Sequence, residues 1–310
     1  MIEARGLGKR YGEHTVLAGL DFHVGRGERV ALLGLNGAGK TTLFRCLLAL
    51  TGFDGNLRVD GEPVTPGCKD IRRKIGYVPQ AAPLYDMTLS EFVAFFAGLR
   101  GVGIAGPAAI LADLGMPLER TGAKALAELS GGMVQKTLLA LALGSGSPLL
   151  LLDEPTANLD PGARRDFFRT LRELASDATL LFASHRLDEI ELLATRVLVL
   201  HEGRLAFDGT LNGLWRTTEA RPRLWLGVPD GEIGSVTAAL ETCPSVSALR
   251  PDGAGLEVDV VGETTLDVLL TVREQGLPVV EFRARPPSLE HVLARLQTDG
   301  PAEPATEERE

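Results

Sequence analysis

The chain has 310 residues, enough for one large or two modest domains with a substantial core. Its net charge of -9 at pH 7 argues against a non-specific nucleic-acid binder, because such proteins usually carry a basic face. The 3 cysteines are odd in number and widely spaced, so no disulfide framework is indicated and a reducing cytosol is expected.

The first residues lack the charged-then-apolar pattern of a signal segment. The longest uncharged run, Thr137–Leu152, is too short to span a bilayer, and glycines and a proline interrupt it. We therefore expect a chain that is soluble by itself and that reaches a membrane only through a partner.

The first segment, Met1–Val24, predicts antiparallel strands with turns near Gly12 and Gly25. From Arg29 onward, apolar strand-like runs alternate with helical patterns, which is typical of an α/β protein with a mainly parallel sheet. A capping box at Thr88–Glu91 predicts a helix to Leu99, and Pro161 predicts a helix to about Ala175. The predicted strands of this part are 29–33, 57–59, 75–78, 149–152, 179–183 and 197–201.

The pattern changes after about Thr218, so the sequence predicts a first domain over 1–218 and an accessory α+β domain over 219–296. Arg221, Pro222 and Arg223 indicate a linker. The elements that follow have the β-α-β-β-α-β order of a ferredoxin-like domain. They are 224–228, 233–242, 245–249, 256–261, 264–274 and 279–284, followed by a last helix at 289–296. The acidic tail 297–310 has almost no apolar residues and is expected to be disordered.

A glycine-rich loop over 34–41 has two glycines four residues apart, followed by Lys40 and Thr41, between a predicted strand and a predicted helix. Glycines let the backbone turn sharply so that several N–H groups point at one anion, and the helix N-terminus adds positive charge. Lys40 would reach the β- and γ-phosphates, and the Thr41 hydroxyl would bind Mg2+. The plain alternative is a glycine-rich turn before a helix.

Two carboxylates, Asp153 and Glu154, follow the apolar strand 149–152. Ligands of open α/β sheets bind at the carboxyl ends of such strands. Asp153 could hold Mg2+ through water beside Thr41, and Glu154 could take the proton of an attacking water as general base. The alternative is a strand end in solvent, where acidic residues are ordinary.

The segment Leu129-Ser130-Gly131-Gly132-Met133, called the signature below, is the motif that points to one specific family. Over roughly residues 2–215 the chain resembles the nucleotide-binding subunit of an ABC transporter. The order of phosphate loop, Gln80, signature, acidic strand and His185 matches that family. The resemblance implies a P-loop NTPase fold with an antiparallel β subdomain, a RecA-like core and a helical subdomain. Met133 departs from the family's usual glutamine, which puts a side-chain contact to nucleotide from this position in doubt.

The resemblance also implies a role for each matching residue, with ATP and Mg2+ as ligands. Tyr11 would stack on adenine, and His185 would contact the γ-phosphate. Gln80 would sense Mg2+ and γ-phosphate and relay that state to the membrane partner, and Lys40 and Glu154 would act in catalysis. The remaining nucleotide contacts are expected from Gly34, Asn36, Gly37, Ala38, Gly39, Thr41, Thr42, Ser130, Gly131 and Gly132, and the remaining metal contacts from Thr41 and Asp153.

A second anion-binding helix N-terminus at Ser130 implies a dimer. A lone chain does not easily wrap this segment onto its own phosphate loop. The family's answer is a head-to-tail pair with ATP between Lys40 of one subunit and Ser130 of the other, and a two-fold arrangement makes both sites at once.

Two further segments, 83–96 and 287–290, resemble drug, lipid and polysaccharide exporters, a group that includes ATPases linked to copper-enzyme maturation. This implies an integral-membrane permease as partner, a homodimer or a paired ATPase subunit, and a place at the cytoplasmic face of the cell membrane. No nucleic acid is expected. The alternatives are an ABC ATPase that acts on DNA or ribosomes and a degenerate regulatory nucleotide binder. A single nucleotide domain argues against the first, and intact Glu154 and His185 argue against the second. The sequence does not indicate a cargo.

Overall fold

The computed structural model describes residues 1–81, 85–157, 159–175, 178–218, 223–229, 231–260 and 265–285. They form two compact units, the first ending at Leu211 and the second beginning at Asn212. The predicted domain boundary fell a few residues later, at 218. The expected last helix 289–296, the exporter-like segment 287–290 and the acidic tail 297–310 lie outside the described residues.

An antiparallel sheet opens the first unit. Its strands are β1 (Ile2–Tyr11), β2 (His14–Val24), β4 (Asp54–Val59) and β5 (Glu62–Pro63), in the order β2-β1-β4-β5. Tyr11 pairs with His14 across the hairpin, so the turn lies at Gly12, which confirms the prediction for this segment.

A six-stranded sheet forms the centre of the first unit. Its order is β10-β9-β3-β8-β7-β6, with β10 antiparallel to β9 and the other neighbours parallel. Every residue of β7 and β8 is buried, as expected for central strands covered on both faces. The strands are β3 (Arg29–Leu33), β6 (Ile75–Val78), β7 (Leu149–Asp153), β8 (Thr179–Ala183), β9 (Arg196–His201) and β10 (Arg204–Gly209).

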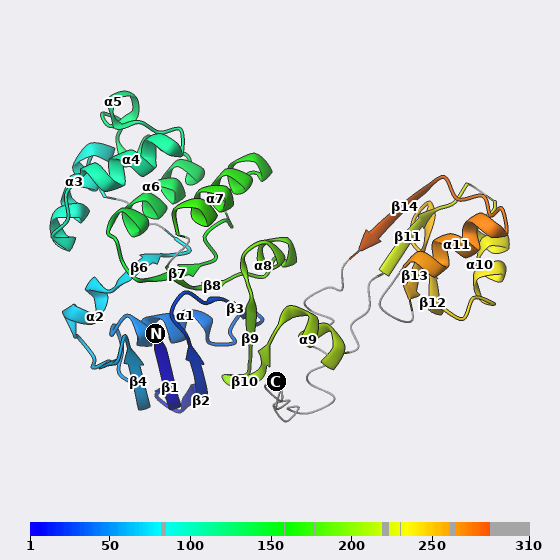
Figure 1. Ribbon diagram of the computed structural model, residues 1–310, viewed down its shortest axis with the longest axis horizontal. Helices are drawn as coiled ribbons and strands as arrows, with labels where there is room; N and C mark the ends of the chain where they lie inside the picture. The colour runs from blue at the N-terminus through cyan, green and yellow to red at the C-terminus, as the bar shows by residue number, and fades with distance from the viewer. Residues whose placement is uncertain are drawn as a thin grey trace. The chain divides into compact units, whose positions relative to one another are not determined.

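Helix α1 (Lys40–Leu47) lies between the two sheets (Figure 1). Leu43, Phe44, Cys46 and Leu47 of this helix are buried in one core with residues of both sheets. This packing fixes the helix N-terminus, and the phosphate loop before it, against the parallel sheet.

A helical layer gathers to one side of the parallel sheet (Figure 1). The predicted capping box is confirmed, because the Glu91 N–H donates to Thr88 Oγ1 (3.3 Å) and the Thr88 N–H donates to Glu91 Oε2 (2.8 Å). The layer contains α3 (Leu89–Arg100), α4 (Ala105–Asp113), α5 (Leu118–Thr121), a 3-10 turn (Leu126–Glu128) and α6 (Gly131–Gly144). Three further helices of this unit are α2 (Lys69–Arg73), α7 (Pro161–Leu174) and α8 (Leu187–Leu193).

Arg100, the last residue of α3, joins this layer to the sheet. Its guanidinium donates to Ile75 O at the start of β6 (2.7 Å), to Arg72 O (3.0 Å) and to Arg73 O (3.1 Å). It also donates to Ser145 Oγ (3.1 Å) and to Ser147 Oγ, just beyond α6. One side chain thus ties the ends of two helices to the edge of the core.

Helix α9 (Leu211–Thr217) begins at the last residue of the first unit, and the second unit then contains a four-stranded antiparallel sheet with two helices. The sheet order β12-β13-β11-β14 is that of the ferredoxin-like arrangement, and an apolar cluster of its own forms its core. These findings confirm the predicted fold class. The elements are β11 (Arg223–Gly227), α10 (Ile233–Leu240), β12 (Val246–Pro251), β13 (Gly255–Val260), α11 (Leu266–Glu274) and β14 (Glu281–Arg285).

Across all of these described segments, no helix combines the length and the apolar character needed to cross a bilayer.

Candidate active site

The loop between β3 and α1 requires glycine at two positions. Gly34 has φ +155° and Gly39 has φ +107°, values that L side chains rarely adopt. A Cβ at Gly34 would lie 2.5 Å from the carbonyl oxygen of Leu200, and one at Gly39 would lie 2.7 Å from Leu17 Cδ2. The loop can therefore fold tightly against the sheet only with glycine at both places.

Lys40, the first residue of α1, is buried with 7% of its surface exposed. Its Nζ donates to the carbonyl oxygens of Gly34 (2.6 Å) and Leu35 (3.3 Å), so the ammonium lies inside the curve of the loop. Burial lowers the pKa of Lys40, while the negative charges of Glu154 and Asp153 oppose that shift. The site therefore holds a desolvated cation, which favours an anionic ligand.

Asp153 ends β7 beside the start of α1. The Thr41 hydroxyl donates to Asp153 Oδ2 at 3.0 Å. Burial raises the pKa of Asp153, and the hydrogen bond from Thr41 and the charge of Lys40 counteract it in part. The predicted pair of oxygen ligands is thus brought into contact, although the two residues lie 112 positions apart in the sequence.

Glu154 has a left-handed backbone conformation, with φ 48°, which is uncommon for a residue with a side chain. Its N–H donates to Ala183 O at the end of β8 (3.1 Å). Its Oε2 lies 2.6 Å from Nδ1 of His185, whose side chain is 60% exposed. The structure thus brings the predicted base into contact with the histidine that is expected to meet the γ-phosphate.

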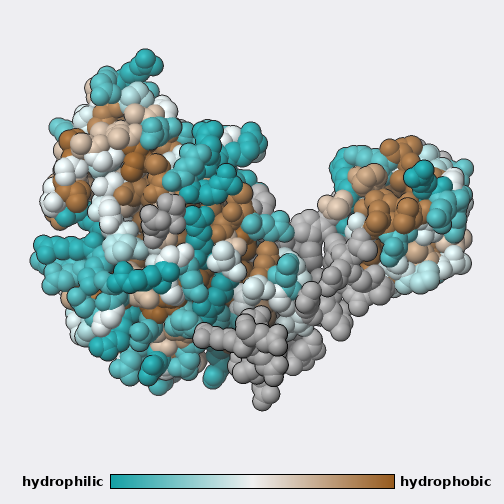
Figure 2. Space-filling model, in the orientation of Figure 1, coloured by the Kyte–Doolittle hydropathy of each residue, from teal (hydrophilic) through white to brown (hydrophobic). Residues whose placement is uncertain are grey.

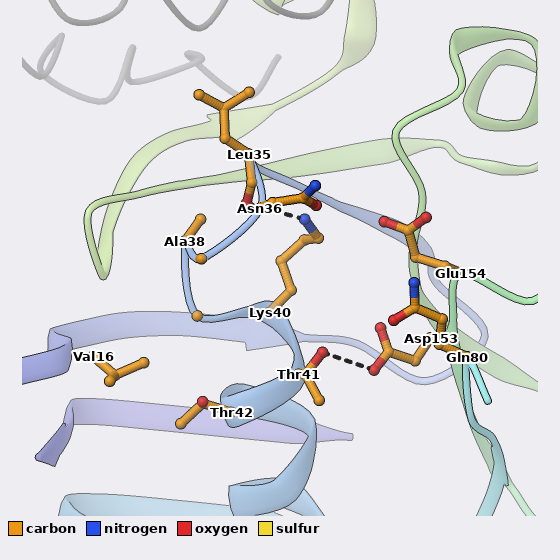
Figure 3. A pocket seen from close by; sticks show the side chains of 12 residues that line it. Val16, Leu35, Asn36, Ala38, Lys40, Thr41, Thr42, Gln80, Asp153 and Glu154 are labelled. Carbon is orange, nitrogen blue, oxygen red and sulfur yellow. Dashed lines mark hydrogen bonds between the residues drawn. The ribbon is translucent and has the colours of Figure 1, made fainter. Parts of the chain in front are cut away.

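Lys40, Thr41, Asp153 and Glu154 face one cavity of about 410 Å³ (Figure 3). In Figure 3, Lys40 and Thr41 approach from the loop and α1, while Asp153, Glu154 and Gln80 approach from the strand ends. Among the described residues that line the cavity, Lys40 is the sole cation. The lining is Val16, Leu35, Asn36, Gly37, Ala38, Gly39, Lys40, Thr41, Thr42, Gln80, Asp153 and Glu154.

Three predicted contacts are not part of this lining. Gly34 is the first residue of the loop, and its carbonyl oxygen accepts a hydrogen bond from the Lys40 ammonium. His185 lines an adjoining cavity of about 80 Å³ with Glu154. Tyr11 ends β1 with 45% of its surface exposed and Lys9 Nζ 4.6 Å from its ring centre, so its contact with adenine stays a prediction.

The signature segment is also absent from this lining. Ser130 caps α6, and its Oγ accepts from the Met133 N–H at 3.3 Å. Ser130 and Gly131 are exposed. The Lys136 ammonium donates to Leu114 O (3.1 Å). The signature is thus an open helix N-terminus whose donors are the backbone and one hydroxyl.

Gln135, on the buried face of α6, is a contact that the sequence did not predict. Its Nε2 donates to Gln80 O at 3.2 Å, and its side chain is almost fully buried. A lone amide in the apolar stretch of a helix was the only signal, and the sequence alone does not name its partner. Gln135 joins the signature helix to the backbone of Gln80.

A buried loop lysine at a helix N-terminus, opposite a strand that ends in two carboxylates, defines a P-loop nucleotide hydrolase. The ABC transporter family matches residues 17–157. The chain is 35% identical to the Nod factor export ATP-binding protein I of Burkholderia orbicola (strain AU 1054), over 95% of this chain and 96% of that protein. The chain therefore belongs to the family of ABC transporter ATP-binding subunits, and it is an ABC-type ATPase.

Solved structures of the same family share the fold. One, an ATP-binding subunit of an ABC transporter, is 32% identical with a TM-score of 0.65, covering 71% of this chain and 93% of that one. Another, a dimeric bacterial ABC transporter cassette, is 25% identical with a TM-score of 0.63, covering 68% of this chain and 99% of that one.

Proposed function

We propose that this ATPase powers an exporter-type ABC transporter as one of two ATP-binding subunits that close around ATP and part after hydrolysis. The observation that carries the proposal is the division of the site within one chain. The cavity holds Lys40 and the carboxylates, whereas the Ser130 helix N-terminus is exposed and outside it. The export function named for the relative from Burkholderia orbicola supports the transport direction.

The second subunit supplies what one cavity lacks. An exposed helix N-terminus attracts anions through its N–H groups and dipole, and Ser130 adds a hydroxyl. In a head-to-tail pair, Ser130, Gly131 and Gly132 of one subunit would cover the phosphates bound by Lys40 of the other. The partner is a second copy of this chain or a paired ATPase, and the dimeric cassette among the solved relatives supports such a pair.

The chemistry follows from the positions of the side chains. Lys40 and the loop N–H groups bind the phosphates, and Glu154 takes the proton of the attacking water. His185 Nδ1 lies 2.6 Å from Glu154 Oε2, and its other ring nitrogen, Nε2, would contact the γ-phosphate. The backbone strain at Glu154 serves this purpose, because it points the carboxylate at the cavity.

The residues present fit a magnesium ion. The Thr41 hydroxyl and the Asp153 carboxylate lie 3.0 Å apart, and the Gln80 amide lines the same cavity. Oxygen atoms of this kind are the ligands that Mg2+ prefers. Thr41, Asp153 and Gln80 would hold the ion, which neutralises phosphate charge when it is bound.

A membrane permease would dock beside Gln80. An apolar hollow of about 310 Å³ lies next to the Gln80 loop, lined by residues such as Tyr77, Phe92 and Phe96. Phe95 and Leu99 of α3 are 50% and 61% exposed, and Figure 2 shows hydrophobic residues over the helical layer. A cytoplasmic segment of the permease would cover this surface and would hold the subunit at the cytoplasmic face of the membrane.

Glu154→Gln tests the proposal. The amide keeps the shape of the side chain but takes no proton, so we expect intact ATP binding and turnover slower by about 10²- to 10⁴-fold. ATP should then hold the variant as a dimer on size-exclusion chromatography. Glu173→Gln, an exposed position on α7, is the matched control. Turnover at the wild-type rate in Glu154→Gln would contradict the assignment.

A further inference from the structure

Glu189, on α8, is a buried carboxylate outside the lining of the ATP cavity, with 2% of its surface exposed. Its Oε2 accepts a hydrogen bond from the Ser184 hydroxyl at 2.6 Å, and its Oε1 accepts one from the Thr156 hydroxyl. Thr156 and Ser184 are themselves buried. The carboxylate therefore bridges two loops that follow neighbouring strands, β7 and β8.

Two arginines balance its charge. Arg186 Nε lies 3.3 Å and Arg164 Nε 3.6 Å from Glu189 Oε1, and Arg164 belongs to α7. Placing a carboxylate in the interior is unfavourable unless it is paired and hydrogen-bonded. Two hydroxyls and two guanidiniums meet that condition at Glu189. The Glu189 carboxylate is therefore a buried structural group of the fold.

The two loops that Glu189 bridges are the ones that carry Glu154 and His185. Thr156 follows Glu154 by two residues, and Ser184 directly precedes His185. The Arg186 N–H donates to Ser184 Oγ at 3.1 Å, which braces the backbone on the other side of His185. Glu154, His185 and Glu189 all line the same cavity of about 80 Å³.

We propose that Glu189 is a positioning residue for ATP hydrolysis, which holds the Glu154 loop and the His185 loop at the spacing that their 2.6 Å contact requires. The inference rests on the proposed function, because it assigns Glu189 to the Glu154–His185 pair. Glu189 contacts neither Lys40 nor Thr41 among the hydrogen bonds and ion pairs described above. It therefore acts on turnover and leaves nucleotide binding alone.

The first experiment compares Glu189→Gln with Glu191→Gln, an exposed position two residues further along the same helix. The glutamine has the same shape, but it loses the charge and replaces one of the two acceptor oxygens with an N–H₂ donor, so the donors at that oxygen lose their acceptor. We expect kcat to fall at least tenfold in Glu189→Gln, with KM for ATP and the affinity for nucleotide within twofold of wild type. Glu191→Gln should match wild type. Unchanged kcat in folded Glu189→Gln would overturn the proposal.

The second experiment separates positioning from general damage. In a Glu154→Gln background the partner that Glu189 positions is already disabled, so adding Glu189→Gln should lower the residual turnover by less than twofold. A further loss as large as in the wild-type background would overturn the proposal. If wild type itself fails to hydrolyse ATP, the proposed function fails instead.

Two conservative variants keep the test open if Glu189→Gln does not fold. Thr156→Val and Ser184→Ala each remove one hydroxyl donor and leave the carboxylate with its arginines. We expect each to lower kcat by about threefold to tenfold with unchanged nucleotide affinity, as loss of one hydrogen bond implies. Wild-type kcat in both variants would overturn the proposal.

Discussion

The phosphate loop and the signature segment are two glycine-containing helix N-termini in one chain, and they differ in what surrounds them. The first has a buried lysine, two carboxylates within the same cavity, and backbone conformations that only glycine fits. The second has an exposed serine that caps its own helix. Both can bind an anion, but only the first has the proposed base and the proposed pair of metal ligands beside it.

This difference supports the proposed pairing of two ATP-binding subunits. A helix N-terminus whose donors are backbone N–H groups and one hydroxyl stabilises negative charge but supplies no general base. In the proposed pair, the signature would therefore contribute binding to a reaction whose chemical groups belong to the other subunit. The comparison can be tested by altering each helix N-terminus separately.

The largest expected effect is on the phosphate-loop side. Lys40→Ala removes the sole cation among the described residues of the cavity lining and leaves Asp153 and Glu154 without its charge. Loss of a hydrogen bond from a charged group is worth about 2–3 kcal/mol, so ATP affinity should fall by about 30- to 150-fold. A calorimetric titration with ATP measures this, with the exposed Lys69→Ala as control. Equal affinity in both variants would refute the role of Lys40.

A smaller effect is expected on the signature side. Aspartate caps a helix as well as serine does, so Ser130→Asp should keep α6 folded but set a negative charge against the phosphate held by the other subunit. We expect turnover to fall by about tenfold, with ATP affinity of the separate subunit unchanged. Ser130→Asn, a neutral cap of the same size, should lose less. If Ser130→Asp weakens ATP binding by the isolated subunit, the division between the two helix N-termini is wrong.

The smallest effect concerns stability. Because burial raises the pKa of Asp153, the folded protein holds this proton at pH values where the unfolded chain has lost it. The ionised carboxylate therefore destabilises the nucleotide-free protein above its folded pKa, and this penalty disappears as pH falls toward about 4, the unfolded value. We expect Asp153→Asn to raise the midpoint of thermal unfolding at pH 8 by a few degrees, and the gain to shrink at pH 4.

The measurement is thermal unfolding without nucleotide and in the presence of a chelator, with the exposed Asp113→Asn as control. The same Asp153→Asn variant should lose ATP turnover, because the amide replaces a charged metal ligand. A midpoint that is lower than wild type at pH 8 would show that the charge of Asp153 stabilises this cavity.

Local patterns in the sequence predicted most of the architecture. The apolar runs of β7 and β8, the capping box at Thr88 and the β-α-β-β-α-β order after 223 all appear in the structure at nearly the expected residues. The helix α4 was not predicted, because its N-cap is Ile104 without a side-chain cap and its first turn contains Gly106 and Pro107. The order of strands within the sheets also depends on long-range packing that no local pattern records.

The phosphate-binding residues and the carboxylates could be predicted because each group lies within one short segment of the sequence, next to a predicted strand or helix. Gln135 and Glu189 could not. Gln135 meets Gln80 across 55 residues and Glu189 meets Thr156 across 33, and a polar residue on a helix face does not reveal its partner. Their importance becomes visible only once the folded chain brings these segments together.

Arg100 donates hydrogen bonds to five acceptors, two of which are the hydroxyls of Ser145 and Ser147 at the C-terminal end of α6. These bonds anchor that end of the helix. The 14 residues of α6 extend about 21 Å from that anchored end to Ser130, at 1.5 Å per residue. If the helical layer tilts as one body about that anchored end by about 10°, Ser130 moves by about 3.7 Å. That distance is longer than a hydrogen bond, so a slight rocking of the helical layer would suffice to engage or release a phosphate at the far end.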